Sequence, residues 1–120
     1  MDIALWIASG LLALAYLFAG TTKALRPKEQ LTGMPWTQRF SAGTVKLIGI
    51  VEVLGAIGLI LPWLTGIAPV LTPIAALGLA LVQVLAAIHH LRHREAKAVP
   101  INIVLLLIAL FIAIGRFAQL

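Results

Sequence analysis

The sequence predicts an all-α integral membrane protein that folds as an antiparallel four-helix bundle. Of its 120 residues, 62% are hydrophobic and only 11% are charged, whereas soluble domains carry roughly 25% charged residues. The apolar residues form four runs, 3–22, 44–62, 69–90 and 99–117, each long enough to cross a bilayer core. Every run also carries a stripe of small or polar residues, which is typical of helices that pack together in membranes. We expect a single domain over 1–120.

The first run, 3–22, is expected to remain in the protein as a membrane span. Signal peptides begin with a positive region, whereas this chain begins Met1-Asp2. Tyr16 and Lys23 are seven residues apart and therefore share one helical face.

Two interpretations of the polar segment 24–43 stay open. Its prolines and glycines interrupt regular structure, while Trp36 and Phe40 are apolar anchors among charged residues. This mixture suits a segment lying in the headgroup region, with Lys and Arg side chains reaching water. An ordinary connecting loop explains the same composition.

The second run, 44–62, carries Glu52 in surroundings that are otherwise apolar or glycine. A charge at that depth costs at least about 2.5 kcal/mol on insertion scales, so we expect Glu52 to face protein. Gly49, Gly55 and Ala56 lie at −3, +3 and +4 and share its face. These small residues would let another helix approach closely. We expect the helix to end at Pro62.

The third run, 69–90, has Gln83 as its polar residue, with Ala76 and Ala80 on the same face. Thr72-Pro73 resembles an N-cap followed by proline at the first helical position, although the helix could begin near Pro69.

The fourth run, 99–117, opens at Pro100 and carries Asn102 and Arg116 at the two ends of a face of small residues. For Arg116 we favour a side chain that extends to the outer interface over an ion pair with Asp2.

The charge distribution predicts the orientation of the chain. Eight of the nine Lys and Arg residues lie in or beside the connections after the first and third runs. The positive-inside rule then predicts a multi-pass protein of the plasma or inner membrane, with cytoplasmic basic loops and both termini outside. This explains the net charge of +5 without nucleic-acid binding, which we do not expect. The chain has no cysteine, which excludes thiol redox chemistry and Cys-ligated clusters within it.

Polar residues from all four helices are expected at similar depth. At about 1.5 Å per residue, Glu52 and Gln83 lie roughly 12 and 10 Å from the cytoplasmic ends of their helices. We predict a ligand- or proton-binding pocket, with Lys23 paired to Glu52. Alternatively, Glu52 only fixes helix packing, and the two amides only make interhelical hydrogen bonds. The predicted pocket residues are Tyr16, Lys23, Glu52, Gln83 and Asn102; the predicted packing residues are Gly49, Gly55, Ala56, Ala76 and Ala80.

The histidines do not predict a metal site. His89 and His93 are four residues apart and Glu95 is near, but there is no HExxH order and no pair of carboxylates. Haem ligation by two histidines would need a second His-bearing helix. We expect solvated side chains at the headgroups.

Several stretches resemble the DoxX-like family of small four-span membrane proteins. They are FAGTTKALRP (18–27), MPW (34–36), KLIGIVEVLGAIGLILP (46–62), GIAPVLTPIAALGLAL (66–81), the HxxRHRE pattern (89–95) and GRFA (115–118). The family takes its name from small subunits of a thiosulfate:quinone oxidoreductase. The resemblance implies a link to membrane oxidoreductase complexes or to membrane-protein assembly, with Lys23 and Glu52 at the matching polar positions. Without cysteine or a cofactor motif, complete sulfur-oxidising activity is not implied.

Three functions stay open on this basis. The first is an accessory or quinone-interacting component of a membrane oxidoreductase system. The second is a non-enzymatic assembly factor or membrane partner subunit, and the third is a small metabolite or lipid transporter. A transporter of four spans would have to be an oligomer, and we expect a homo-oligomer in the lipid bilayer. No covalent cofactor is expected; quinone or another small hydrophobic molecule is the candidate ligand.

Overall fold

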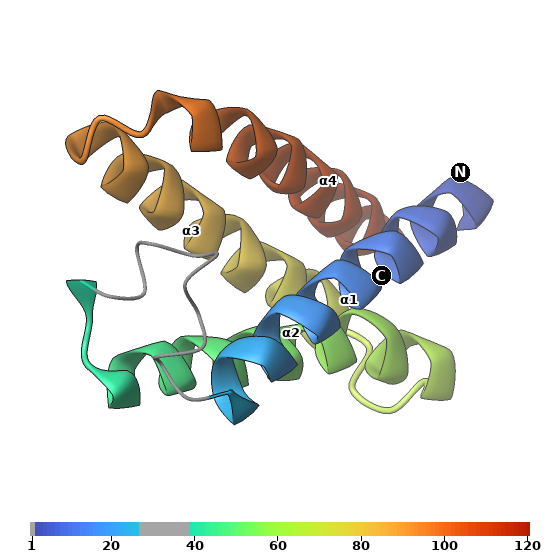
Figure 1. Cartoon of the computed structure of the whole chain (residues 1–120). Helices are drawn as coiled ribbons and strands as arrows, with labels where there is room; N and C mark the ends of the chain where they lie inside the picture. Colours follow the sequence, from blue (N-terminus) through green and yellow to red (C-terminus); the bar gives the residue numbers. More distant parts are fainter. Residues whose placement is uncertain (1, 27–38) are drawn as a thin grey trace.

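The computed structural model describes residues 2–26 and 39–120, which form four long helices (Figure 1). The described residues contain no strand, and the all-α prediction is confirmed. The helices are α1 (Asp2–Leu25), α2 (Ala42–Thr65), α3 (Leu71–Arg92) and α4 (Val99–Ala118), with the short 3-10 helix η3 (Ala96–Ala98) before α4.

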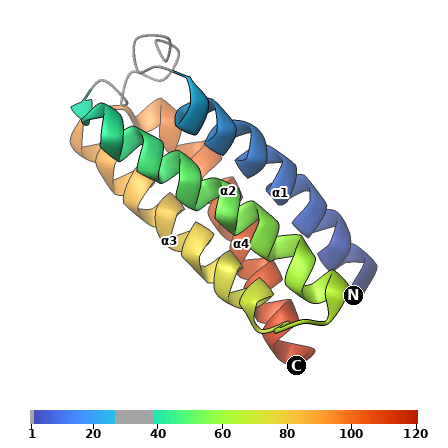
Figure 2. The same ribbon diagram turned by 90° about the horizontal axis from the view of Figure 1, so that it is seen from below.

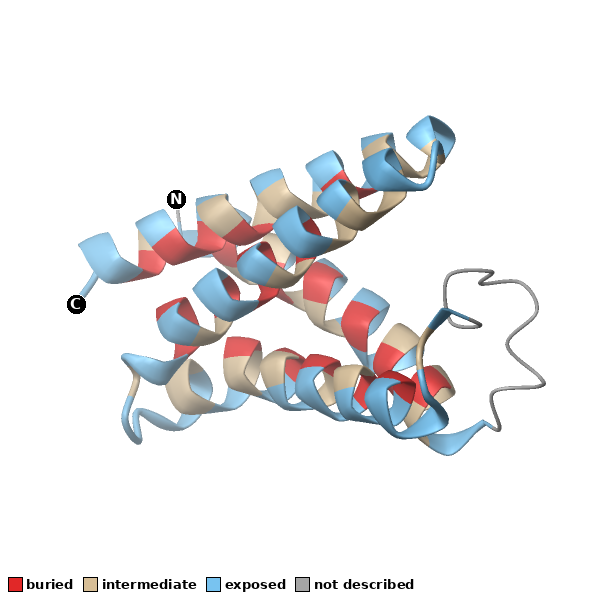
Figure 3. Cartoon of the chain, turned by 90° about the vertical axis from the view of Figure 1, so that its left-hand side faces the viewer, coloured by how far each residue is buried: buried red, intermediate tan, exposed pale blue. Residues whose placement is uncertain are grey.

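All four long helices are apolar and long enough to cross a membrane. The 24 residues of α1 or α2 extend about 36 Å, more than the roughly 30 Å of a bilayer core. Buried positions face the inside of the bundle and exposed positions face outward (Figure 3). The exposed positions include many large apolar side chains, such as Phe18, Leu54 and Ile114. This outer surface suits lipid.

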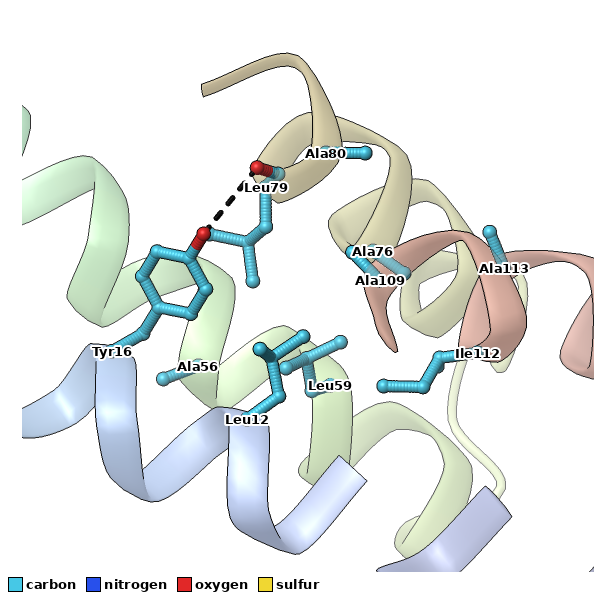
Figure 4. Packing of buried hydrophobic residues seen from close by; sticks show 10 residues of the cluster. All are labelled: Leu12, Tyr16, Ala56, Leu59, Ala76, Leu79, Ala80, Ala109, Ile112 and Ala113. Carbon is cyan, nitrogen blue, oxygen red and sulfur yellow. Dashed lines mark hydrogen bonds between the residues drawn. The ribbon is translucent and has the colours of Figure 1, made fainter. Parts of the chain in front are cut away.

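Consecutive helices run antiparallel, so both termini lie at one end of the bundle (Figures 1 and 2). An ion pair between Arg116 Nη1 and Asp2 Oδ1, 2.8 Å apart, joins α4 to α1 there. The core between the helices is small and apolar, with one tyrosine (Figure 4). Its residues are Leu12, Tyr16, Ala56, Leu59, Ala76, Leu79, Ala80, Ala109, Ile112 and Ala113.

The helix α2 continues through Pro62 to Thr65, so the expected end at Pro62 is wrong. A proline inside a helix removes the amide that would bond the carbonyl four residues earlier, here that of Gly58. The hydroxyl of Thr72 on α3 donates to this carbonyl instead, at 2.9 Å. α2 ends at Thr65 and is capped by Gly66, whose φ of 73° is left-handed and whose amide donates to the carbonyl of Pro62.

The other boundaries differ from the sequence prediction by a few residues. α3 starts at Leu71, so Thr72 lies inside the helix and does not cap it; its hydroxyl is bonded to α2 instead. α3 continues to Arg92, and α1 continues to Leu25. Most of segment 24–43, including Trp36, lies outside the described residues, so its two interpretations stay open.

Glycines set the spacing between α1 and α2. A Cβ added at Gly20 would lie 2.6 Å from the carbonyl oxygen of Gly49, and one added at Gly49 would lie 2.6 Å from the carbonyl oxygen of Gly20. Only residues without a side chain allow this approach. The contact lies one turn from Lys23 on α1 and from Glu52 on α2, which brings these two side chains together.

Small residues also bring α2 and α3 into contact near their connection. A Cβ at Gly55 would lie 2.7 Å from Leu79 Cδ2, and one at Gly58 would lie 2.8 Å from the Cβ of Ala75. Of the other expected packing residues, Ala56, Ala76 and Ala80 are buried in the core. Away from Gly66, α2 and α3 diverge toward the end that carries the basic connections (Figure 1).

Candidate functional site

A cavity of about 440 Å³ lies among the four helices, in the half of the bundle distant from the termini. This volume is in the range of small-molecule sites. The wall is mainly apolar and includes all five polar residues that the sequence predicts for a pocket. The lining residues are Ala15, Tyr16, Ala19, Lys23, Phe40, Leu47, Ile48, Val51, Glu52, Val82, Gln83, Leu85, Ala86, His89, His90, Asn102 and Leu105.

The ion pair that the sequence predicts between Lys23 and Glu52 is present in the cavity wall. Lys23 Nζ lies 2.6 Å from Glu52 Oε1, and both side chains are buried. Taking two charges out of water is costly, and their mutual attraction offsets that cost only in close contact. The Gly20–Gly49 approach of α1 and α2 supplies this contact.

A hydrogen bond from Gln83 Nε2 to the hydroxyl of Tyr16 links α3 to α1 across the bundle. The Tyr16 hydroxyl in turn donates to the carbonyl of Leu79 at 3.5 Å (Figure 4). Tyr16 therefore uses its hydroxyl both as donor and as acceptor. The pair fixes the inner end of the cavity, next to the apolar core.

Two buried polar atoms from cavity-lining residues have no hydrogen-bond partner among the residues that the structure describes. They are Oε1 of Gln83 and Nδ2 of Asn102, an acceptor from α3 and a donor from α4. Buried polar groups are nearly always hydrogen-bonded to protein, water or ligand. These two amide groups therefore keep an unused hydrogen-bonding capacity beside the cavity.

The structure adds His89, His90 and Phe40 to the cavity wall. The expectation that these histidines are simply solvated is corrected for His89 and His90, which are only partly exposed. The rings of Phe40 and His89 have centroids 5.2 Å apart. His90 lies seven residues after Gln83, and the sequence spacing places the two on one helical face. In 2–26 and 39–120 no group of three potential ligands could hold a metal ion.

A cluster of charged residues bounds the cavity at the end of the bundle distant from the termini. Glu95 Oε1 accepts hydrogen bonds from Arg39 Nη1 at 2.8 Å and from His90 Nδ1 at 3.1 Å. Arg39 Nη1 also lies 3.1 Å from His89 Nε2. The bonds from Arg39 and His90 lower the pKa of Glu95 from 4.5 to about 2, so Glu95 is ionised at neutral pH. The cluster joins the residues before α2 to the end of α3.

Arg116 lies at the opposite end of the bundle and is fully buried. The expectation that it extends to the interface is wrong, because α1 and α2 supply partners inside the protein. Its guanidinium carbon lies 4.9 Å from the ring centroid of Trp6 and 4.6 Å from that of Trp63. Nη1 donates to Asp2 and, at 2.7 Å, to Oε1 of Gln119. Stacking on aromatic rings suits arginine, which is more weakly hydrated than lysine.

Comparison with known proteins identifies one family. The sequence profile of the DoxX-like family matches residues 7–112, which cover α2 and α3 completely, most of α1 and α4, and every residue of the cavity wall. No curated protein and no solved structure matches the chain.

Proposed function

The chain belongs to the DoxX-like family, and from this membership and its cavity we propose that it is an accessory, quinone-interacting component of a membrane oxidoreductase system. The observation that carries the proposal is the 440 Å³ cavity with polar residues from all four helices in an otherwise apolar wall. Ligand sites typically combine a mainly apolar wall with a few well-placed polar groups.

The polar groups suit the chemistry of a quinone head group. A quinone presents two carbonyl oxygens, and Asn102 Nδ2 is a buried donor that lacks an acceptor in the described part of the chain. The quinol form, which a partner oxidoreductase would produce by adding two electrons and two protons, has hydroxyls at these positions, and they can donate to Gln83 Oε1. Glu52 can exchange a proton with a bound quinone or quinol, because its carboxylate lies in the wall of the same cavity.

We further propose that the cavity lies in the cytoplasmic half of the membrane. The end of the bundle beside the cavity carries Arg39, Arg92, Arg94 and Lys97, whereas the other end carries Arg116. The positive-inside rule assigns the first group to the cytoplasm. Both termini are then outside. The homo-oligomer expected from the sequence stays a prediction.

Binding can be tested with the purified protein in quinone-free lipid nanodiscs. The probe is a decyl-substituted benzoquinone, and the readout is infrared difference spectroscopy of protein labelled with ¹³C-glutamate. We expect a saturable shift of a carboxyl band that is absent in Glu52→Gln. Asn102→Leu should weaken binding by about tenfold, since it removes one buried donor. The lipid-facing variant Leu54→Ala, a matched control, should bind normally.

A flat titration would overturn the proposal. If the wild-type protein shows neither saturable binding nor a carboxyl shift, the cavity does not hold quinone. The role of partner subunit or assembly factor would then be the better account of the family membership. Affinity purification with the wild-type protein or the Glu52→Gln variant as bait would test this role. If Glu52 only fixes helix packing, both baits should recover the same membrane complexes in equal amount.

A further inference from the structure

The gap between α2 and α3 is closed at the end near Gly66. There, Gly55 and Gly58 let α2 pack directly against Leu79 and Ala75 of α3. The Thr72–Gly58 hydrogen bond holds the same contact. Nothing larger than a hydrogen atom fits at these two glycines without displacing a neighbour. The divergence of the two helices therefore begins beyond this contact, on the side where the cavity lies.

Large apolar side chains form the two sides of this gap. Leu47 and Val51 lie four residues apart on α2, and Leu85 lies on α3; all three line the cavity. They are also 60%, 45% and 58% exposed, respectively. A side chain that lines a cavity and also lies on the outer surface marks the edge of that cavity. The cavity therefore reaches the lipid-facing surface between α2 and α3.

Contacts of Arg39 and Phe40 bound the gap toward the aqueous end. Phe40 packs against His89, and Arg39 is bonded to Glu95 beyond the end of α3. With the glycine contacts at the other end, these interactions frame a window between α2 and α3. We define this window by Leu47, Val51, Leu85 and Phe40. It opens sideways, toward the hydrocarbon of the bilayer.

We propose that a membrane-dissolved ligand enters through this window and that its single apolar chain stays in it while its head group occupies the cavity. The inference rests on the proposed function in that it requires a small molecule in the cavity. The volume of about 440 Å³ holds a substituted ring, and the window gives a longer chain a path out of the cavity. Because lipid tails are about as apolar as leucine, a chain lying between window and bilayer loses no solvation. A two-chain phospholipid would need two such paths.

The α1 side of the cavity provides the internal comparison. Its exposed lining residue is Ala15, a small side chain that offers a chain little contact. Among the exposed lining residues that the structure describes, the large side chains all lie on α2 and α3. This difference identifies the flank through which the chain passes.

The test uses two probes with the same ring, a decyl-substituted benzoquinone and the ring without its chain. Tryptophan at Leu47 and Leu85 together (Leu47→Trp/Leu85→Trp) should fill the window. We expect the decyl probe to lose at least about tenfold more affinity than the ring alone, both corrected for membrane partitioning. The matched control is Leu54→Trp/Leu81→Trp, which adds the same side chains to lipid-facing positions outside the cavity wall. Binding of both probes there should equal that of the wild type.

A second measurement does not require the protein to fold with the tryptophan substitutions. A probe with a photoreactive group in the middle of its chain should cross-link wild-type protein at Leu47, Val51 or Leu85. Cross-linking at Ala15, or loss of decyl binding in Ala15→Trp alone, would overturn the window. Equal weakening of both probes by the double variant would also overturn it. If neither probe binds the wild-type protein, the proposed function itself fails.

Discussion

The hydroxyl of Thr72 occupies the place of an amide hydrogen that Pro62 cannot supply. It donates to the carbonyl of Gly58 at 2.9 Å, across the contact between α3 and α2. Pro62 can therefore lie inside α2 without leaving this carbonyl unbonded. The same bond fastens the two helices at the closed end of the window.

Replacing Thr72 by valine should destabilise the protein by about 1–3 kcal/mol, the usual cost of an unsatisfied buried acceptor. Valine keeps the shape of threonine but cannot donate. Thr72→Ser should retain most of the stability. The measurement is equilibrium unfolding in mixed micelles, compared in a cycle with Pro62→Ala, which restores the amide. Equal losses in both backgrounds would contradict the interpretation.

Gly49→Ala should destabilise the contact between α1 and α2. Its Cβ would lie 2.6 Å from the carbonyl oxygen of Gly20, and overpacking of this kind costs about 1–3 kcal/mol. Gly10→Ala on α1 is the matched control, because nothing lies within 4 Å of its added Cβ. Unfolding should show a loss for the first and no loss for the second. Similar stabilities for both variants would show that helix spacing does not depend on Gly49.

The Lys23–Glu52 pair should behave as a unit. Lys23→Met alone leaves a buried carboxylate and should cost about 3–5 kcal/mol, whereas Lys23→Met/Glu52→Leu should come close to wild-type stability. The double-mutant cycle measures the coupling directly. Additive losses would mean that the two charges are stabilised independently. Loss of quinone binding in the stable double variant would then be a functional effect.

Arg116→Lys should lower stability although the charge is kept. Lysine cannot stack on Trp6 and Trp63 while bonding Asp2, and cation–π contacts contribute about 0.5–2 kcal/mol. The matched control is Arg92→Lys at the exposed end of α3, which should leave the unfolding temperature unchanged. A similar small effect at both positions would argue against the stacked arrangement.

Glu95 should titrate near pH 2 in the folded protein. The bonds from Arg39 and His90 lower its pKa from 4.5 to about 2, so their stabilising effect is complete above pH 4.5 and is lost as the pH falls through about 2. Carbon-13 NMR of the side-chain carboxyl measures the midpoint. Arg39→Gln should move it back toward 4.5. An unchanged midpoint in that variant would show that Arg39 does not hold Glu95.

The sequence predicted the fold because hydrophobic length and small-residue stripes act locally along each helix. The sequence also predicted the Lys23–Glu52 pair, because a buried carboxylate in a membrane needs a partner. It could not predict that α2 passes through Pro62, because the compensating donor, Thr72, comes from another helix. The burial of Arg116 could not be predicted for a similar reason: Trp6 and Trp63, which stack on it, are distant in sequence. The inclusion of His89 and Phe40 in the cavity wall depends on how α2 and α3 diverge, which no single helix encodes.

The pair formed by Asp2 and Arg116 has a consequence for biosynthesis. These residues are 114 positions apart, so the contact cannot form until α4 has been translated and inserted. Until then Asp2 and Trp6 lack their arginine partner, and α1 can pack only against α2 or α3. Closure of the bundle at this end should therefore be a late step of membrane insertion, after the pairing of α1 with α2. A chain arrested before α4 emerges should accordingly remain open to proteases or chaperones for longer than the finished protein.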